Sequence, residues 1–171
     1  MQLHLVDQEH GLVEAWQRHF KDFPEVAVVH GDILSIAHTA VVSPTNSYGY
    51  MDGGIDLAYI EFFGTPLQAA VQDAIGRRPD GLLPVGASLV VKTRHPRIQY
   101  LIVAPTMVLP EPVPAQNCYF AMSAVLRAAD AHPQLTDIFC PGLATGVGRV
   151  PFEPAASEMA NAYRNWRTRP R

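Results

Sequence analysis

The sequence is poor in the residues that build disulfide frameworks and metal sites. Only two of its 171 residues are cysteines, Cys118 and Cys140, and both lie among apolar neighbours. We expect them to be reduced core residues, because they match neither a disulfide framework nor zinc-ligand spacing. The seven histidines are scattered and form no His-Glu-x-x-His motif. The sequence therefore predicts no protein metal site.

Long apolar runs and blocks of positive charge are also missing. No apolar run approaches the roughly 20 residues of a membrane span, and the N-terminus lacks the basic start and apolar stretch of a secretory signal. We therefore expect a cytoplasmic protein with no membrane partner. The formal net charge is −3, and the only Lys/Arg-rich stretch is the tail at 164–171. This argues against a nucleic-acid groove, whereas a small anion can bind to backbone amides alone.

What the sequence does contain is a series of short apolar strands that alternate with amphipathic helices. Its length fits one domain spanning 1–171, and no internal repeat or change of composition divides it. The alternation predicts an α/β fold of three layers, with a mixed, mostly parallel sheet flanked by helices. The apolar segments at 88–91 and 100–104 are typical of central strands. We predict strands at 3–6, 26–30, 40–43, 88–91, 100–104 and 138–140, and helices near 9–21, 55–62, 67–74, 122–129 and 156–163.

A polar loop follows the strand at 40–43 and ends in Gly53-Gly54, just before a helix. Glycines in this place let the backbone approach a ligand and point amides at an anion. Asp56 falls in the first turn of that helix, and Asn46 lies in the loop. Both residues also have a structural interpretation, Asp56 as a complement to the helix dipole and Asn46 as a turn residue.

A second glycine-bearing loop, residues 142–151, lies between the strand at 138–140 and the last helix. This placement suits a phosphate nest, although the loop matches neither a Walker loop nor Gly-x-Gly-x-x-Gly. In α/β folds, ligands bind at the carboxyl ends of the strands. Because both loops directly follow strands, we expect them to face one crevice.

Other catalytic schemes have little support in the sequence. It has no Gly-x-Ser-x-Gly elbow, and neither cysteine has an obvious histidine partner. His30 and His38 flank strand ends, where a histidine serves as an acid or base or, more often, as a structural residue. Tyr48 and Tyr50 lie in the first loop and either stack on a ligand ring or pack against the protein.

Four segments, in the right order, resemble motifs of the macrodomain family, which binds ADP-ribose and includes ADP-ribosyl hydrolases. The ten-residue separation of Asn46 and Asp56 resembles that of the hydrolase branch. The resemblance covers residues 26–166. The segments are His-Gly-Asp-Ile at 30–33, Val-Val-Ser-Pro-Thr-Asn at 41–46, Gly-Gly-Ile-Asp at 53–56 and Gly-Leu-Ala-Thr-Gly-Val-Gly-Arg-Val-Pro at 142–151.

This resemblance implies a site for ADP-ribose that uses no metal or other cofactor. Asp32 would accept a hydrogen bond from the adenine amino group, beside the amide of Ile33. Asn46 would hold the distal ribose. Asp56 would position or deprotonate a water near the anomeric carbon, in the hydrolysis of mono-ADP-ribosyl esters on a modified target. The diphosphate would lie along Gly53, Gly54, Ile55, Thr145, Gly146, Val147 and Gly148, with Arg149 as a further contact.

The sequence departs from the family pattern at three places that bear on catalysis. Ser43 replaces a family asparagine, Asp52 adds negative charge near the expected phosphates, and Gly148-Arg149 replaces a bulky residue followed by glycine. A non-catalytic reader of ADP-ribose and a phosphatase acting on ADP-ribose 1''-phosphate therefore stay open as alternatives. A structural domain that has lost the ligand is a third. The sequence specifies neither the modified target nor the oligomeric state.

The N-terminal residues 1–25 form an extra strand and helix outside the family-like region. A macrodomain is expected to continue past its last helix into one more strand and helix. We hypothesise that the N-terminal unit fills that place, as in a permuted chain. The strand at 3–6 must then lie in the sheet, and a residue near Val6–Asp7 would border the adenine pocket.

Overall fold

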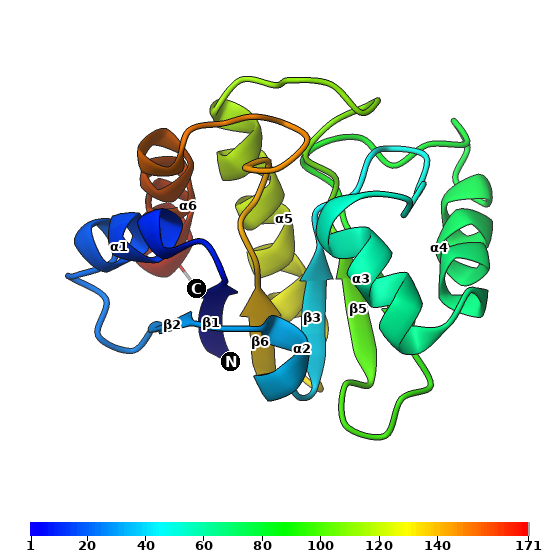
Figure 1. Cartoon of the computed structure of the whole chain (residues 1–171), viewed down its shortest axis with the longest axis horizontal. Helices are drawn as coiled ribbons and strands as arrows, with labels where there is room; N and C mark the ends of the chain where they lie inside the picture. Colours follow the sequence, from blue (N-terminus) through cyan, green and yellow to red (C-terminus); the bar gives the residue numbers. More distant parts are fainter. Residues whose placement is uncertain (171) are drawn as a thin grey trace.

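The computed structural model describes residues 1–170 as a six-stranded sheet between two layers of helices (Figure 1). The strands are β1 (Gln2–Asp7), β2 (Ala27–His30), β3 (Ala40–Ser43), β4 (Leu89–Lys92), β5 (Tyr100–Val103) and β6 (Asp137–Cys140). The helices are α1 (His10–His19), α2 (Ile33–Ile36), α3 (Gly54–Phe63), α4 (Pro66–Gly76), α5 (Gln116–Ala131) and α6 (Phe152–Thr168).

The strands follow the order β2-β1-β6-β3-β5-β4. All neighbours pair in parallel except β4, which runs antiparallel to β5. The predicted α/β fold with a mixed, mostly parallel sheet between helices is thus confirmed. Because five strands run the same way, their carboxyl ends meet at one edge of the sheet.

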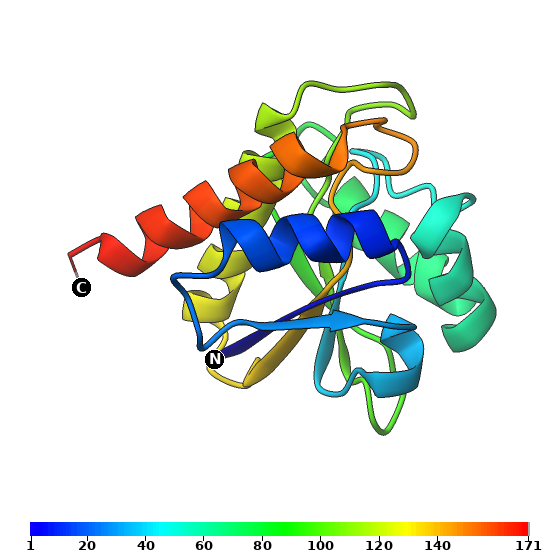
Figure 2. The same cartoon turned by 60° about the vertical axis from the view of Figure 1, so that its left-hand side comes forward.

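Each strand sends side chains alternately into two cores, as the pleat of a strand requires. In β3, Val42 packs with α1, α5 and α6, whereas Val41 packs with α3 and α4 on the other face. Helix α6 packs against both α1 and α5 (Figure 2). Among residues 1–170, no helix combines the length and apolar character needed to cross a membrane.

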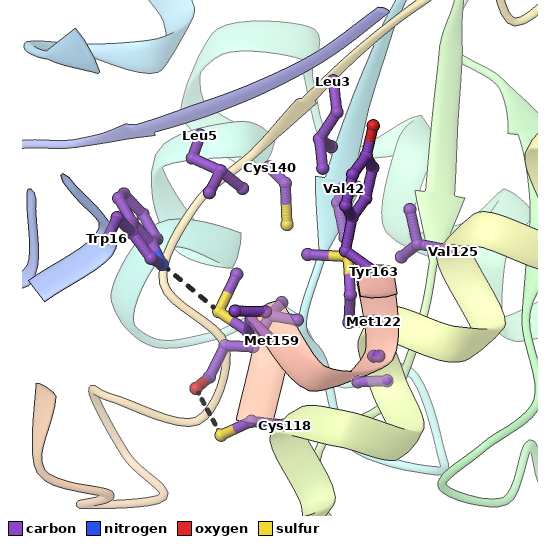
Figure 3. Packing of buried hydrophobic residues seen from close by; sticks show 14 of the residues in the cluster. Leu3, Leu5, Trp16, Val42, Cys118, Met122, Val125, Cys140, Met159 and Tyr163 are labelled. Carbon is purple, nitrogen blue, oxygen red and sulfur yellow. Dashed lines mark hydrogen bonds between the residues drawn. The ribbon is translucent and has the colours of Figure 1, made fainter. Parts of the chain in front are cut away.

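The core under α1, α5 and α6 contains both cysteines (Figure 3). Cys118 and Cys140 are buried and not joined in a disulfide, which confirms the expectation of reduced core residues. Trp16 donates its indole N–H to the sulfur of Met159 over 3.4 Å, and this contact joins α1 to α6. The indole is therefore satisfied within a fully apolar environment.

The expectation of a central strand at 88–91 is wrong, because β4 is an edge strand. Val90 packs against one core, and Leu89 and Val91 pack against the other. Helices cover both faces of the strand, so its apolar content does not distinguish an edge from a centre. Helix α2 was also not predicted, although Asp32 caps its N-terminus by accepting from the amide of Leu34, a recognised start signal.

Strand β1 lies in the interior of the sheet, hydrogen-bonded to β2 on one side and to β6 on the other. The N-terminal strand is thus part of the sheet, as the hypothesis of a permuted chain requires. This position brings Asp7, at the carboxyl end of β1, level with His30 of β2. Residues 1–25 therefore contribute to the sheet edge at which both glycine-bearing loops begin.

Candidate functional site

A cleft of about 600 Å³ opens at the carboxyl edge of the sheet. This is the expected position for a ligand in an α/β fold. Segments that follow all five parallel strands line it, so residues far apart in the sequence meet there. These segments begin at Asp7, the last residue of β1, at Gly31 after β2, at Pro44 after β3, at Thr106 after β5 and at Pro141 after β6.

The cleft brings together nearly all of the residues predicted from the sequence. Arg149 is the exception, because it is not among the lining residues and its side chain is exposed. The predicted residues that line the cleft are Asp32, Ile33, Asn46, Gly53, Gly54, Ile55, Asp56, Thr145, Gly146, Val147 and Gly148.

The side chain of Asn46 holds the first loop in shape. Its amide nitrogen donates to the carbonyl of Tyr50 over 3.0 Å, and its oxygen accepts from the amides of Tyr48 and Tyr50 over 3.1 and 3.3 Å. Asn46 is only 4% exposed, so these bonds satisfy a side-chain amide that has little access to water. The structural interpretation of Asn46 as a turn residue is therefore correct, and Asn46 lines the cleft as well.

Asp56 is a buried carboxylate at the start of α3, only 6% exposed yet part of the cleft lining. Ser43, the last residue of β3, donates its hydroxyl to Asp56 Oδ1 over 2.5 Å. Burial raises the pKa of Asp56 to about 7, against the opposing effect of the Ser43 and Thr45 hydroxyls, and the charge of Asp52 raises it further. A carboxyl with this pKa changes charge near neutral pH, as a general base should.

Two sets of backbone amides belong to residues that line the cleft. Gly53 caps α3 without a side-chain hydrogen bond, so the first-turn amides of α3 have no partner inside the helix. Gly54 has a φ of 57°, a conformation that favours glycine. In the second loop, the amides from 145 to 148 donate to no group within residues 1–170. Both sets are available to an anion.

The second loop is held by a distant carboxylate and by close packing. Asp7 of β1 accepts from the amide of Gly142 over 2.9 Å. A Cβ on Gly148 would lie 2.7 Å from the carbonyl oxygen of Ala144, so only glycine fits there. Further along, Val150 donates its amide to the carbonyl of Ala144 over 2.9 Å. The loop therefore closes tightly on itself.

The charged residues of the cleft lining are all acidic. No Lys, Arg or His is found among the lining residues in the part of the chain that the structure describes. A bound anion would therefore depend on the backbone amides and on the dipole of α3. The acidic residues are Asp7, Glu9, Asp32, Asp52 and Asp56.

At the β2 end of the cleft, the Asp32 carboxylate is engaged in capping α2. It accepts from the amide of Leu34 over 3.0 Å and from the hydroxyl of Ser35 over 2.8 Å. A carboxylate offers about four lone-pair positions, so it can accept a further donor. Ile33 follows it directly, is buried and lines the cleft.

Part of the cleft lining was not predicted from the sequence. Gln8 and Glu9 line the cleft after β1, and Thr106 lines it after β5. Asp7 also lies there, as the hypothesis about the N-terminal strand anticipated. These residues belong to no glycine-bearing motif, and their only signal is that each follows a predicted strand.

The other candidates have mostly structural contacts. His30 bonds to the carbonyl of Gln8, His38 lies edge-on to the ring of Phe139, and neither histidine lines the cleft. Tyr50 does line it, whereas Tyr48 does not. Within residues 1–170, no group of three or more His, Cys, Asp or Glu side chains is placed to hold a metal ion.

Comparison with known proteins agrees with this arrangement. The Macro domain family model matches residues 42–159. An uncharacterised protein of Aquifex aeolicus is 30% identical over 143 residues, covering 83% of this chain and 82% of the relative.

Solved structures show the same fold. The macrodomain of Mycobacterium tuberculosis DarG superposes with a TM-score of 0.68 at 22% identity, over 79% of this chain and 87% of that one. A variant of the Oceanobacillus iheyensis macrodomain with ADPR gives 0.67 at 20% identity, over 78% and 73%. The family model matches more than half of the chain, so the chain belongs to the Macro domain family.

Proposed function

We propose that this protein binds ADP-ribose and hydrolyses mono-ADP-ribosyl esters, with Asp56 as the general base. The observation that carries the proposal is a buried carboxylate, with a pKa of about 7, in the first turn of an uncapped helix that lines the cleft. The Oceanobacillus iheyensis macrodomain with ADPR supports the choice of ligand. The proposed enzyme needs no cofactor.

In this proposal, ADP-ribose spans the cleft from the end of β2 to the start of α3. Asp32 accepts from the adenine amino group, beside Ile33. The diphosphate lies between the first-turn amides of α3 and the amides from 145 to 148, which can hold it where no cationic side chain is available. The distal ribose then lies beside Asn46 and Asp56.

The chemistry requires only a water molecule and the acyl-linked ribose. Asp56 accepts a proton from the water as the water oxygen bonds to the anomeric carbon. The bond from that carbon to the acyl oxygen breaks, and the released carboxylate keeps the electron pair. Because only ionised Asp56 acts as the base, the rate should rise with pH through the pKa of about 7.

The two alternatives use the same cleft in different ways. A reader of ADP-ribose is favoured by the engagement of Asn46 with its own loop, since that residue then has less freedom to act on a substrate. A phosphatase acting on ADP-ribose 1''-phosphate is disfavoured. Its terminal phosphate would lie near the carboxylates of Asp52 and Asp56, and like charges repel.

The decisive experiment compares wild type with Asp56→Asn. We expect calorimetry to give similar affinities for ADP-ribose, while release of ADP-ribose from a mono-ADP-ribosylated peptide falls about 10²–10⁴-fold, the usual contribution of a general base. Glu61→Gln, an exposed carboxylate on the same helix, is the matched control and should keep full activity. Equal turnover in Asp56→Asn would exclude the catalytic role. Binding without turnover in wild type would establish the reader.

A further inference from the structure

Two side chains fasten the start of α3 to the end of β3. Ser43, which is fully buried, donates its hydroxyl to Oδ1 of Asp56 over 2.5 Å. One turn along the helix, Tyr59 donates its hydroxyl to the carbonyl of Val42 over 2.9 Å. The first contact fixes the carboxylate, and the second fixes the helix that carries it.

We propose that Ser43 is a positioning residue that holds the Asp56 carboxylate in one orientation through both its charged and its neutral states. The proposal rests on the proposed function, because it concerns the base that we assign to hydrolysis. Ser43 itself does not line the cleft. It therefore acts through Asp56 and not by touching the substrate.

A hydroxyl suits this task because it both donates and accepts. In the structure Ser43 donates to Asp56 Oδ1, which is the arrangement that an ionised carboxylate, an acceptor only, requires. When Asp56 has taken up a proton, the hydroxyl can turn and accept from it. An alanine in this place would leave a buried carboxylate without its donor. An amide, as in the family pattern that Ser43 departs from, has separate donor and acceptor atoms and must flip to do the same.

The groups around Asp56 determine how far its ionisation depends on the hydroxyl of Ser43. Asp52 lies near enough for its charge to oppose ionisation of Asp56. Tyr59 lies on the same helix, where the charges of Asp56, Asp7 and Asp32 all act on it. No Lys, Arg or His lines the cleft within the described residues. Ionisation of Asp56 is therefore favoured by the hydroxyls of Ser43 and Thr45, the two groups that lower its pKa.

The experiment compares Ser43→Ala with Ser47→Ala. Ser47 is an equally buried serine in the loop that follows β3, but its hydroxyl donates to the carbonyl of Met107. The midpoint of Asp56 is measured in the ligand-free protein by carboxyl ¹³C NMR. We expect Ser43→Ala to move it upward by about one pH unit, because the charge-assisted bond to the ionised carboxylate is stronger than the bond to the neutral one, and both are lost. Ser47→Ala should leave it in place.

Turnover gives a second readout with its own signature. At pH 7, Ser43→Ala should lose about fivefold in kcat, because a midpoint one unit higher leaves about a tenth of Asp56 ionised in place of half. Activity should return near pH 9, and the affinity for ADP-ribose should stay unchanged. A variant that merely destabilised the fold would lose activity at every pH.

The outcomes separate this proposal from the proposed function. An unmoved Asp56 midpoint in folded Ser43→Ala would overturn the positioning role, whatever the activity. If that variant does not fold, Ser43→Cys serves in its place, since a thiol is a weak donor of similar size, and it should give a smaller upward shift. If the Asp56 midpoint shifts in Ser43→Ala but the wild type shows no turnover, the contact between Ser43 and Asp56 is supported and the proposed hydrolase function is refuted.

Discussion

The two glycine-bearing loops face the same cleft, but different contacts hold them. In the first loop, residues 44–54, the side chain of Asn46 bonds to the backbone of Tyr48 and Tyr50. In the second loop, residues 142–151, the carboxylate of Asp7 accepts from the amide of Gly142, and the backbone packs closely on itself at Gly148.

The difference shows that the conformation of a loop can be maintained in two ways. In the first loop polar side chains maintain it, so a substitution that removes their atoms should destabilise the loop. In the second loop close packing maintains it, as at Gly148, so a substitution that adds an atom should destabilise the loop. Substitutions that remove or add atoms therefore test the comparison directly.

The largest effect is expected from Asn46→Ala. It leaves the amides of Tyr48 and Tyr50 without their partner and removes one of the two donors to the carbonyl of Tyr50, which keeps the Thr45 hydroxyl. The free energy of unfolding should fall by about 2–3 kcal/mol, which lowers Tm in calorimetry by roughly 5–10 °C for a chain of this size. Asn46→Asp keeps the accepting oxygen and should lose less. Equal stability of wild type and Asn46→Ala would contradict the internal support of this loop.

Gly148→Ala should break the second loop with a smaller loss. The added carbon would lie 2.7 Å from a backbone oxygen and 3.0 Å from Val113 Cγ2, and such overpacking costs about 1–3 kcal/mol. Gly146→Ala is the matched control, since its Cβ would meet nothing within 4 Å. Chemical denaturation of the two variants checks the difference. Equal denaturation midpoints of the two variants would show that the second loop accommodates the added carbon and is not maintained by close packing.

The same contrast explains which parts of the site were predictable from sequence. Short glycine-bearing motifs carry a local signature, so Gly53, Gly54 and the residues from 145 to 148 were identified before their geometry was known. Asp7 carries none, because its role depends on β1 lying beside β6. Strand order is a property of the whole sheet and leaves little trace in any one segment.

The fold shows the same limit. The pattern of short apolar runs identified all six strands within one residue at each end, because a strand that packs between two apolar cores is apolar on both faces. It placed β4 wrongly at the centre, since an edge strand covered on both faces has the composition of a central one. Ser43 was noted only as a departure from a motif. Its contact with Asp56, thirteen positions along the chain, required the structure.

The smallest effect is expected from Arg149→Gly in the second loop. Arg149 has a φ of 52° and an exposed side chain outside the cleft lining. A non-glycine residue in this conformation costs about 1–2 kcal/mol, of which glycine's greater freedom in the unfolded chain offsets about half. Arg149→Gly should therefore raise the free energy of unfolding by roughly 0.5–1 kcal/mol.

Arg94→Gly is the control for this change, because Arg94 has a φ of 64° in the turn before β5, at the end of that strand opposite the cleft. Both variants should gain stability in calorimetry, and both should bind ADP-ribose as wild type does. If Arg149→Gly alone weakened binding, its guanidinium would contact the ligand. Ligand binding by the second loop would then depend on a charged side chain as well as on close packing. The two loops would differ less, because both would use polar side chains.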